Sequence, residues 1–366
     1  MTESAQKRFF VAATRQNQGK TSVCLGLMAA FQRRFTNVGF IKPVGQRYTV
    51  VDGQQVDEDS VLIEAVCRVK CALKDMSPVA VDAGFTQRYL TNPGQHDLTR
   101  RILDSYERVA EGQSLVLIEG TGHAGVGSVF DLSNADVARL LDASVVIVSG
   151  GGIGAPIDEI MLNRAMFELA GVPVVGAIVN KVRPDKYDKI NELVRVGLER
   201  HGVEVLGVIP YVPMLAYPSV GLIMEETGAE LLCGQGRLDA QVQRTVVGAM
   251  AAHSTLDYLG EGVLLVTPGA RTDVILGAVC ASVVFGDSGG VAGIVLTGDE
   301  RPHHTVLSLL NKTDIPVLAV KSDTYSTTSS IHDVMVKVRP NDTRKIKTLT
   351  SLVEEHVNID RLASLI

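Results

Sequence analysis

Short apolar runs alternate with longer amphipathic stretches over the first 215 residues of the chain. Six runs rich in Val and Ile predict buried strands: RFFVAAT, NVGFIKPV, SLVLIEG, SVVIVSG, VPVVGAIVNKV and VEVLGVIPYV. The stretches between them predict helices, among them TSVCLGLMAAFQRR, EDSVLIEAVCRVKCALK and DKYDKINELVRVGLERHG. Wholly apolar strands that alternate with helices are typical of a parallel sheet with helices on both faces. The pattern therefore predicts an α/β fold that binds its ligands at the carboxyl ends of the strands.

The rhythm changes near 211–225, where YVPMLAYPSVGLIMEE carries two prolines and a tyrosine-rich turn. Strand-like runs resume after it, such as GVAGIVLTG and IPVLAVKS, and they predict a second, smaller α/β domain. The last residues, DTRKIKTLTSLVEEHVNIDRLASLI, have the charge pattern of one amphipathic helix. We therefore expect a first domain at 1–215, a second at 216–335 and a C-terminal helix within 336–366.

Composition narrows the class of protein. A chain of 366 residues with 46% hydrophobic and 21% charged residues is expected to form two compact, ordered domains. Its formal net charge is −6 and it has no long basic run, which argues against nucleic acid or an anionic membrane as its partner. No stretch has the length of a membrane span, and the N-terminus lacks the apolar core of a signal peptide. Five scattered cysteines favour reduced thiols, so we expect a cytoplasmic protein.

The first predicted strand and helix enclose a candidate phosphate-binding loop, Gly19-Lys20-Thr21. The common pattern G-x-x-x-x-G-K-[ST] has a glycine six residues before its lysine, where this chain has Thr14. Gly19 lets the backbone approach an anion, Lys20 suits the β- and γ-phosphates, and Thr21 suits a magnesium ion. An ordinary turn with a solvated lysine is the alternative. The predicted nucleotide-binding loop consists of Asn17, Gln18, Gly19, Lys20, Thr21 and Ser22.

Four ordered segments carry a family resemblance: ATRQNQGKTSVCLGL, VGFIKPVGQ, LVLIEGTG and GAIVNKV. They resemble the dethiobiotin-synthetase and cobyrinate-amidase group of phosphate-loop proteins. That group has its small residue one place earlier than the common pattern, followed by threonine, and Ala13-Thr14 stand there. The resemblance to the dethiobiotin-synthetase-like N-terminal region of long phosphate acetyltransferases is closer still, because RTVVGAM and VTPGARTDVILGAV look like the DRTGG domain that follows there. It covers most of the chain.

The resemblance implies a set of site residues and the cofactors ATP and Mg²⁺. Lys42 matches a lysine beside the reacting groups, so with Lys20 it is implied to be catalytic; a surface lysine before a proline is the alternative. Asp59 and Glu119 match the acidic metal ligands. Asp59 also suits the start of a helix, whereas Glu119 directly follows a buried apolar run and has little structural reason to be there. Thr21 completes the implied magnesium set. Asn180 is implied to contact adenine, while strand termination is its simpler explanation.

Other residues leave several interpretations open. The family's small hydroxyl residues after Pro43 are replaced by Gly45-Gln46-Arg47-Tyr48, which argues against dethiobiotin chemistry. The glycine run at 148–156 suits a close backbone approach or a flexible turn. His123 and His303-His304 read as solvated side chains, and Cys67 with Cys71 as the apolar face of one helix. Arg271-Thr272-Asp273 reads as a helix start or an anion site.

Two functions remain in view. One is an ATP-dependent ligase or amidase that activates a carboxylate; the other is a regulatory or nucleotide-sensing protein with weak or no turnover. The substrate-side departures favour the second function. The acetyl-transferring domain of the long phosphate acetyltransferases would need about 300 more residues, so the chain as given is not expected to carry it. The resemblance also implies a homo-oligomer, with a dimer expected. The partners expected are a nucleotide and an unidentified small-molecule substrate or effector.

Overall fold

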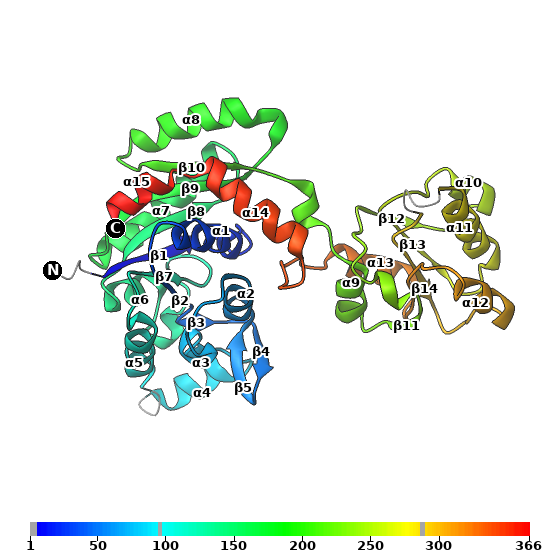
Figure 1. Ribbon diagram of the computed structural model, residues 1–366, viewed down its shortest axis with the longest axis horizontal. Helices are drawn as coiled ribbons and strands as arrows, with labels where there is room; N and C mark the ends of the chain where they lie inside the picture. Colours follow the sequence, from blue (N-terminus) through cyan, green and yellow to red (C-terminus); the bar gives the residue numbers. More distant parts are fainter. Residues whose placement is uncertain (1–5, 94–96, 286–289) are drawn as a thin grey trace. The chain divides into compact units, whose positions relative to one another are not determined.

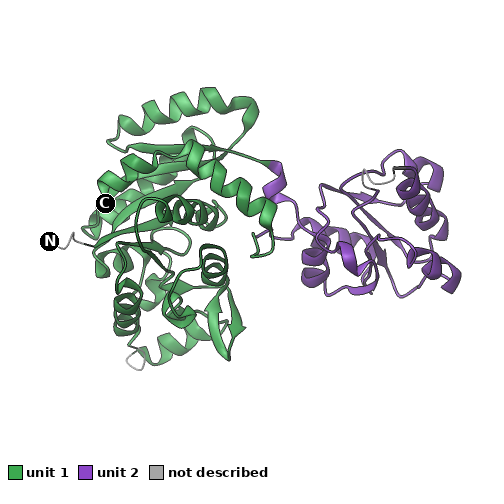
Figure 2. Ribbon diagram, viewed as in Figure 1, with its two compact units in different colours: residues 1–212, 338–366 green, residues 213–337 purple. Residues whose placement is uncertain are grey.

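The computed structural model describes residues 6–93, 97–285 and 290–366, which belong to two compact units (Figures 1 and 2). Unit 1 comprises residues 1–212 together with 338–366, and unit 2 comprises residues 213–337. Helices alternate with strands in both units, so each of them is an α/β unit. No helix in the described ranges has the length and apolarity needed to cross a membrane.

Unit 1 is built on a six-stranded sheet in which every neighbouring pair is parallel. The strand order is β10-β9-β8-β1-β7-β2. The six predicted apolar runs form these strands: β1 (Lys7–Ala13), β2 (Val38–Ile41), β7 (Leu115–Glu119), β8 (Ser144–Ser149), β9 (Val174–Val182) and β10 (Val205–Pro210). Most of their side chains are buried, as a sheet covered on both faces requires. The α/β prediction is confirmed.

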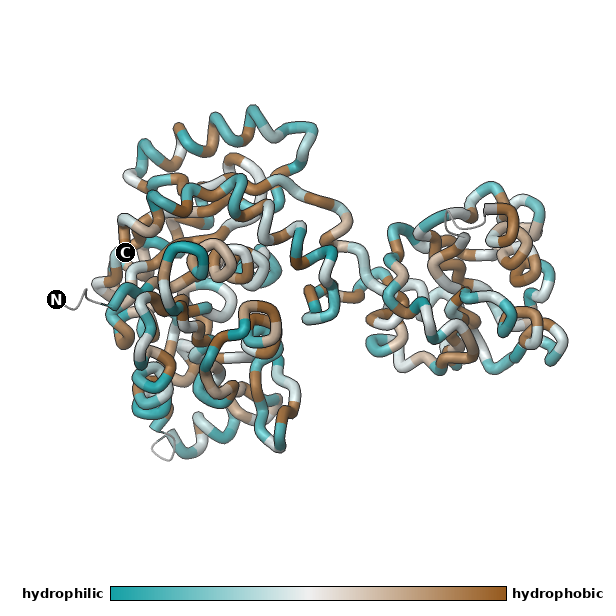
Figure 3. Tube along the Cα trace, viewed as in Figure 1, coloured by the Kyte–Doolittle hydropathy of each residue, from teal (hydrophilic) through white to brown (hydrophobic). Residues whose placement is uncertain are grey.

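The described part of unit 1 contains ten α-helices (Figure 1). Figure 3 shows α8 alternating between polar and apolar residues along its length, and its apolar residues Ile190, Val194 and Leu198 are buried. Such alternation is expected of a helix with one face on a sheet. The helices are α1 (Lys20–Gln32), α2 (Glu58–Cys67), α3 (Leu73–Met76), α4 (Phe85–Thr91), α5 (Leu98–Ala110), α6 (Asn134–Leu140), α7 (Gly154–Leu169), α8 (Tyr187–Glu199), α14 (Thr343–His356) and α15 (Ile359–Leu365).

The segment between β2 and α3 departs from the predicted pattern. Two short strands, β4 (Tyr48–Val51) and β5 (Gln54–Asp57), form an antiparallel hairpin, and β3 (Val44–Gly45) pairs with β6 (Val79–Ala80). The helix predicted over EDSVLIEAVCRVKCALK ends at Cys67, because Arg68 takes a left-handed conformation with φ 51°. Cys71 lies beyond that end, so the prediction that Cys67 and Cys71 share a helix face is wrong.

The C-terminal segment forms two helices instead of the single helix predicted. Val357 leaves the helical path to bridge Gly207 of β10, and the N–H of Asn358 donates to Leu206 O at 2.8 Å. These contacts return the segment to the edge of the first sheet. α14 also packs on α1, where a Cβ added to Gly26 would lie 2.4 Å from the side chain of Val353. The C-terminal residues are therefore part of unit 1.

Unit 2 contains a five-stranded sheet in the order β11-β15-β14-β13-β12. Its pairs are parallel except that of β11 with β15. Apolar residues from both faces of this sheet form two buried clusters with the helices. The strands are β11 (Glu230–Cys233), β12 (Arg244–Val247), β13 (Val263–Pro268), β14 (Gly293–Thr297) and β15 (Val317–Ala319), and the helices are α9 (Val220–Thr227), α10 (Ala252–Leu256), α11 (Thr272–Phe285), α12 (His304–Leu310) and α13 (Thr324–His332).

Candidate functional site

The predicted phosphate loop follows β1 at the carboxyl end of the first sheet. β1 ends at Ala13 and α1 begins at Lys20, with Gly19 as its N-cap at φ 86°. This left-handed conformation suits glycine, and a Cβ at Gly19 would lie only 2.4 Å from Asn180 Nδ2. Thr21 and Ser22 lie in the first turn of α1, so the loop leads into a helix N-terminus that favours an anion.

Asn180 and Lys181, at the end of β9, hold the backbone of this loop. The Asn180 amide donates to Gln18 O at 2.9 Å, and Lys181 Nζ donates to Asn17 O at 2.6 Å. Lys181 itself has a left-handed φ of 60°, and its N–H donates to Asn180 Oδ1 at 2.9 Å. These two residues therefore shape the loop directly, a contact that sequence reasoning missed. The adenine contact implied for Asn180 stays a prediction.

The glycines after β8 also approach this loop. A Cβ at Gly150 would lie 2.5 Å from Gln18 Oε1, and one at Gly151 would lie 2.6 Å from Lys181 O. Side chains at either position would push the loop or β9 away. On the other side, Gln16 Nε2 donates to Gln46 Oε1 at 3.2 Å, so a residue of the segment that departs from the family pattern contacts the loop.

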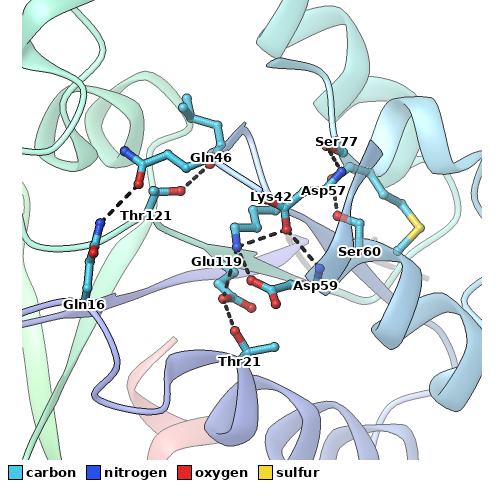
Figure 4. A network of polar contacts seen from close by, with 12 residues as sticks. Gln16, Thr21, Lys42, Gln46, Asp57, Asp59, Ser60, Ser77, Glu119 and Thr121 are labelled. Carbon is cyan, nitrogen blue, oxygen red and sulfur yellow. Dashed lines mark hydrogen bonds and ion pairs between the residues drawn. The ribbon is translucent and has the colours of Figure 1, made fainter. Parts of the chain in front are cut away.

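Lys42 lies directly after β2 and is surrounded by three carboxylates (Figure 4). We call Lys42, Asp57, Asp59 and Glu119 the Lys42 cluster; all four side chains are buried. Lys42 Nζ forms an ion pair with Asp59, lies 3.1 Å from Asp57 Oδ1 and lies 3.7 Å from Glu119 Oε1. The surface-lysine alternative for Lys42 is therefore wrong. Burial opposes the charge of Lys42, but the surrounding carboxylates outweigh burial and raise its pKa well above the ordinary value.

Glu119 joins this cluster to the phosphate loop. Thr21 Oγ1 donates to Glu119 Oε1 at 2.8 Å, while Glu119 Oε2 is buried without a hydrogen-bond partner. Burial raises the pKa of Glu119 to about 7, although the nearby Lys42 opposes the shift. A carboxyl group in this state accepts a cation readily, because a cation would pair the orphaned oxygen and stabilise the charge.

Lys20 is the second cation of the site. Burial lowers the pKa of its ammonium group, and the charge of Glu119 offsets part of that effect. Within the described part of the chain, Lys20 makes no hydrogen bond or ion pair at contact distance. A partly buried ammonium at a helix N-terminus is suited to an anionic ligand such as a phosphate.

Asp57 is a member of the cluster that the predicted site did not include. It is the N-cap of α2, and its Oδ1 accepts the N–H of Asp59 at 2.9 Å as well as the Lys42 contact. Its Oδ2 is buried without a partner, and burial raises the pKa of this carboxyl. The acidic run before the predicted helix is the signal that indicates a cap at this position, but it does not indicate the contact with Lys42.

The predicted magnesium ligands lie together at this site. Thr21 contacts Glu119, and both Glu119 and Asp59 contact Lys42. They supply one hydroxyl and two carboxylates, the oxygen donors that Mg²⁺ prefers, and Glu119 has an oxygen to spare. The described residues contain no group of three His, Cys, Asp or Glu side chains that could hold a metal ion. One hydroxyl and two carboxylates would fill only part of a magnesium coordination shell, so a bound ion would take its other ligands from phosphates and water.

Two of the histidines singled out in the sequence accept backbone hydrogen bonds. His123 is exposed, and its Nδ1 accepts the N–H of Gly125 at 3.2 Å. His303 caps α12 by accepting the N–H of Thr305 at 3.3 Å.

In unit 2, Arg271 pairs with Asp273 at 2.9 Å and donates to Met250 O at 2.8 Å, and these contacts hold the loop that follows β12.

The chain matches two family models and is similar to several curated proteins. A family model described as "AAA domain" matches residues 7–219, and one described as "DRTGG domain" matches residues 222–334. A phosphate acetyltransferase of Nitratidesulfovibrio vulgaris is 30% identical over 97% of this chain and 51% of its own length. One of Pseudomonas putida is 27% identical over 96% of this chain and 50% of its own length. The chain thus spans about half the length of the curated relatives it matches.

Solved structures provide weaker likenesses. The cell division ATPase MinD of Pyrococcus furiosus has a TM-score of 0.37 at 17% identity, covering 57% of this chain and 86% of its own. The CBS and DRTGG domains of Clostridium perfringens pyrophosphatase have a TM-score of 0.26 at 20% identity, covering 36% of this chain and 59% of theirs. From the family models, the chain belongs to the AAA domain family of phosphate-loop proteins and carries a DRTGG domain after the family's domain.

Proposed function

We propose that unit 1 binds ATP together with Mg²⁺ and that the protein is a nucleotide sensor with weak or no turnover. The observation that carries the proposal is the Gly19-Lys20-Thr21 loop at the start of α1, with Glu119 hydrogen-bonded to Thr21. A glycine that frees the backbone, a partly buried lysine and a hydroxyl beside a carboxylate are what a nucleotide phosphate with its metal requires.

Each residue has a role in this proposal. The loop backbone and the first turn of α1 cradle the phosphates, and Lys20 pairs with their charge. Thr21, Asp59 and Glu119 hold the Mg²⁺ ion, which when bound neutralises charge on the phosphate oxygens. Asn180 and Lys181 keep the loop in shape, and we propose that Asn180 also contacts the adenine ring, as the resemblance implies.

The DRTGG unit is the second part of the proposed sensor. In a sensor, nucleotide binding shifts an equilibrium only if two states of the protein bind the nucleotide with different affinity. We propose that unit 2 is where such a shift is read, by an unidentified small molecule or by a second copy of the chain in a dimer. Its folded α/β core and the family match support a separate domain with a function of its own.

A second function is favoured by one observation, the position of Lys42. A buried lysine among carboxylates beside the phosphate loop could stabilise charge on a phosphoryl group moving from ATP to a substrate carboxylate. In this alternative the protein is an ATP-dependent ligase or amidase. The departures at Gly45-Gln46-Arg47-Tyr48 weigh against the dethiobiotin substrate.

Phosphate release measured alongside binding separates the two functions. With ATP and Mg²⁺ saturating, the sensor proposal predicts stoichiometric binding with phosphate release no faster than about one per minute, far below the rate of about 10 per second typical of enzymes. The matched variants are Lys42→Met and Lys74→Met, the latter an exposed lysine on α3. Release at an enzymatic rate that falls only in Lys42→Met would overturn the sensor proposal in favour of the ligase.

A further inference from the structure

The Lys42 cluster holds one ammonium group where the proposed function requires a metal ion. Two of the three proposed metal ligands, Asp59 and Glu119, already lie against Lys42 Nζ. The ion pair with Asp59 is direct, and the distance to Glu119 Oε1 is 3.7 Å. Lys42 is therefore the cation that neutralises these carboxylates in the structure.

A divalent ion and Lys42 compete for the same negative charge. Burial makes electrostatic repulsion strong, because little water lies between charges to screen them. Lys20, also partly buried, is a second ammonium group whose charge interacts with that of Glu119. A metal ion arriving alone would meet two positive groups around its ligands, so its binding is opposed until further negative charge is present.

Two buried oxygens indicate that the cluster has acceptor capacity beyond its present contacts. Glu119 Oε2 and Asp57 Oδ2 are both inaccessible to solvent and both lack a hydrogen-bond donor. Buried acceptors without donors are uncommon and costly. Glu119 is hydrogen-bonded to Thr21 (Figure 4), so an additional positive group at that point would satisfy its free oxygen, whereas Asp57 Oδ2 lies on the side of Gly45.

We propose that Lys42 is the resident cation of this carboxylate site and that a divalent metal ion enters only together with nucleotide phosphates. The phosphates supply the negative charge that lets metal and Lys42 share the site, with Asp57 retaining Lys42 through its Oδ1 contact. This inference rests on the proposed function and adds to it an order of binding. The site does not bind free Mg²⁺, but it binds the complex of the metal with the nucleotide.

Binding of Mn²⁺, followed by the paramagnetic resonance signal of the free ion, tests the proposal without any activity measurement. Wild-type protein is expected to take up Mn²⁺ at least about tenfold more tightly with a non-hydrolysable ATP analogue than without it, once the Mn²⁺ that the analogue binds in the absence of protein has been subtracted. Lys42→Met is expected to bind one Mn²⁺ per chain without nucleotide. Lys74→Met, which loses an exposed lysine, is expected to behave as wild type.

A double variant shows which carboxylates take the metal. Mn²⁺ captured by Lys42→Met is expected to be lost when Glu119→Gln is added, because the orphaned oxygen then belongs to a neutral amide. Circular dichroism and a thermal melt establish that each variant is folded. If Lys42→Met does not fold, Lys42→Gln takes its place, because the wild-type comparison tests the order of binding and not the part played by Lys42.

The outcomes separate this inference from the proposed function. Wild-type binding of Mn²⁺ that is equally tight with and without the analogue overturns the inference, as does a folded Lys42→Met that captures none. Either result leaves nucleotide binding itself intact. Failure of the wild type to bind the analogue at all overturns the proposed function, whereas metal capture by Lys42→Met would still assign Lys42 as the resident cation.

Discussion

At the scale of single residues, Glu119 gives the site a pH dependence near neutrality. Its pKa in the folded protein is about 7, above the 4.5 of an unhindered carboxyl group. Between these two values the folded state binds more protons than the unfolded state, so the free energy of unfolding decreases as the pH rises. The carboxylate form of Glu119 therefore costs folded stability above about pH 7.

Glu119→Gln should remove this dependence. One pKa unit corresponds to about 1.4 kcal/mol, so the difference in free energy of unfolding between variant and wild type should shift by about 2 to 3 kcal/mol in favour of the variant from pH 5 to pH 8. Urea denaturation at several pH values measures it. Parallel curves for the two proteins over that range would show that Glu119 titrates normally.

Gly19 is the residue whose backbone and surroundings both demand glycine. Gly19→Ala places a side chain at φ 86° and within 2.4 Å of Asn180 Nδ2, whereas Gly53→Ala imposes a similar φ of 76° with no atom within 4 Å. Each should lose about 1 to 2 kcal/mol of stability from the left-handed conformation. Only Gly19→Ala should also weaken nucleotide binding. We expect its dissociation constant for ATP to rise about tenfold, which corresponds to a loss of about 1.4 kcal/mol of binding free energy.

Titration calorimetry with ATP and Mg²⁺ distinguishes these variants. Gly53 lies in the turn between β4 and β5 and serves as the control for backbone strain. Equal affinities in the two variants would mean that the contact of Gly19 with Asn180 does not shape the binding loop.

At the scale of elements, the packing of α14 on α1 joins the end of the chain to the first sheet. Val353 is 2% exposed and lies against Gly26, a position where any side chain would clash. Val353→Asp buries a charge without a partner and should cost about 3 kcal/mol. Ser351→Asp, exposed on the same helix, should change stability by no more than about 0.5 kcal/mol.

Chemical denaturation measures both changes, and a probe in each unit locates them. The loss in Val353→Asp should appear in unit 1, although the residue follows unit 2 in the sequence. A loss confined to unit 2, or no loss, would contradict the assignment of α14 to the first unit.

The helices and strands also show which parts of the fold the sequence predicts and which parts it does not. Every strand of the first sheet was recognisable, because a buried parallel strand is a continuous run of apolar residues. The hairpin at 48–57 was missed, since its exposed residues have no such run. The end of α2 at Arg68 was missed because neither glycine nor proline marks it. The two C-terminal helices could not be separated, since their break depends on contacts with distant β10.

The residues of the candidate site also fall into those that the sequence predicts and those that it does not. The phosphate loop could be located from local spacing, as could Glu119, an acidic residue that directly follows a buried run. Asp57 and Lys181 could not be assigned, because their roles come from neighbours far away in the sequence. Sequence predicts which residues bear chemistry, while their partners follow only from the fold.

At the scale of the whole molecule, a sensor must transmit binding from one unit to the other. Ligand at 100 times its dissociation constant stabilises the binding unit by about 2.7 kcal/mol. ATP with Mg²⁺ should therefore slow hydrogen exchange in β1, α1 and β7 of unit 1. The regulatory proposal further predicts altered exchange in unit 2, which has no part in the proposed nucleotide site.

Exchange followed by mass spectrometry reports both units in one experiment. Lys20→Ala is the control, since it should abolish the response throughout the chain. Protection limited to unit 1 would argue that the two units act independently, against a sensor that spans both.

The most direct test of nucleotide binding is calorimetric titration of wild type and Lys20→Ala with ATP and with GTP, each with and without Mg²⁺. The account predicts Mg²⁺-dependent binding of ATP at one site per chain, weaker binding of GTP, and loss of binding in Lys20→Ala. Wild-type protein that binds neither nucleotide, or that binds ATP equally well after Lys20→Ala, would contradict it.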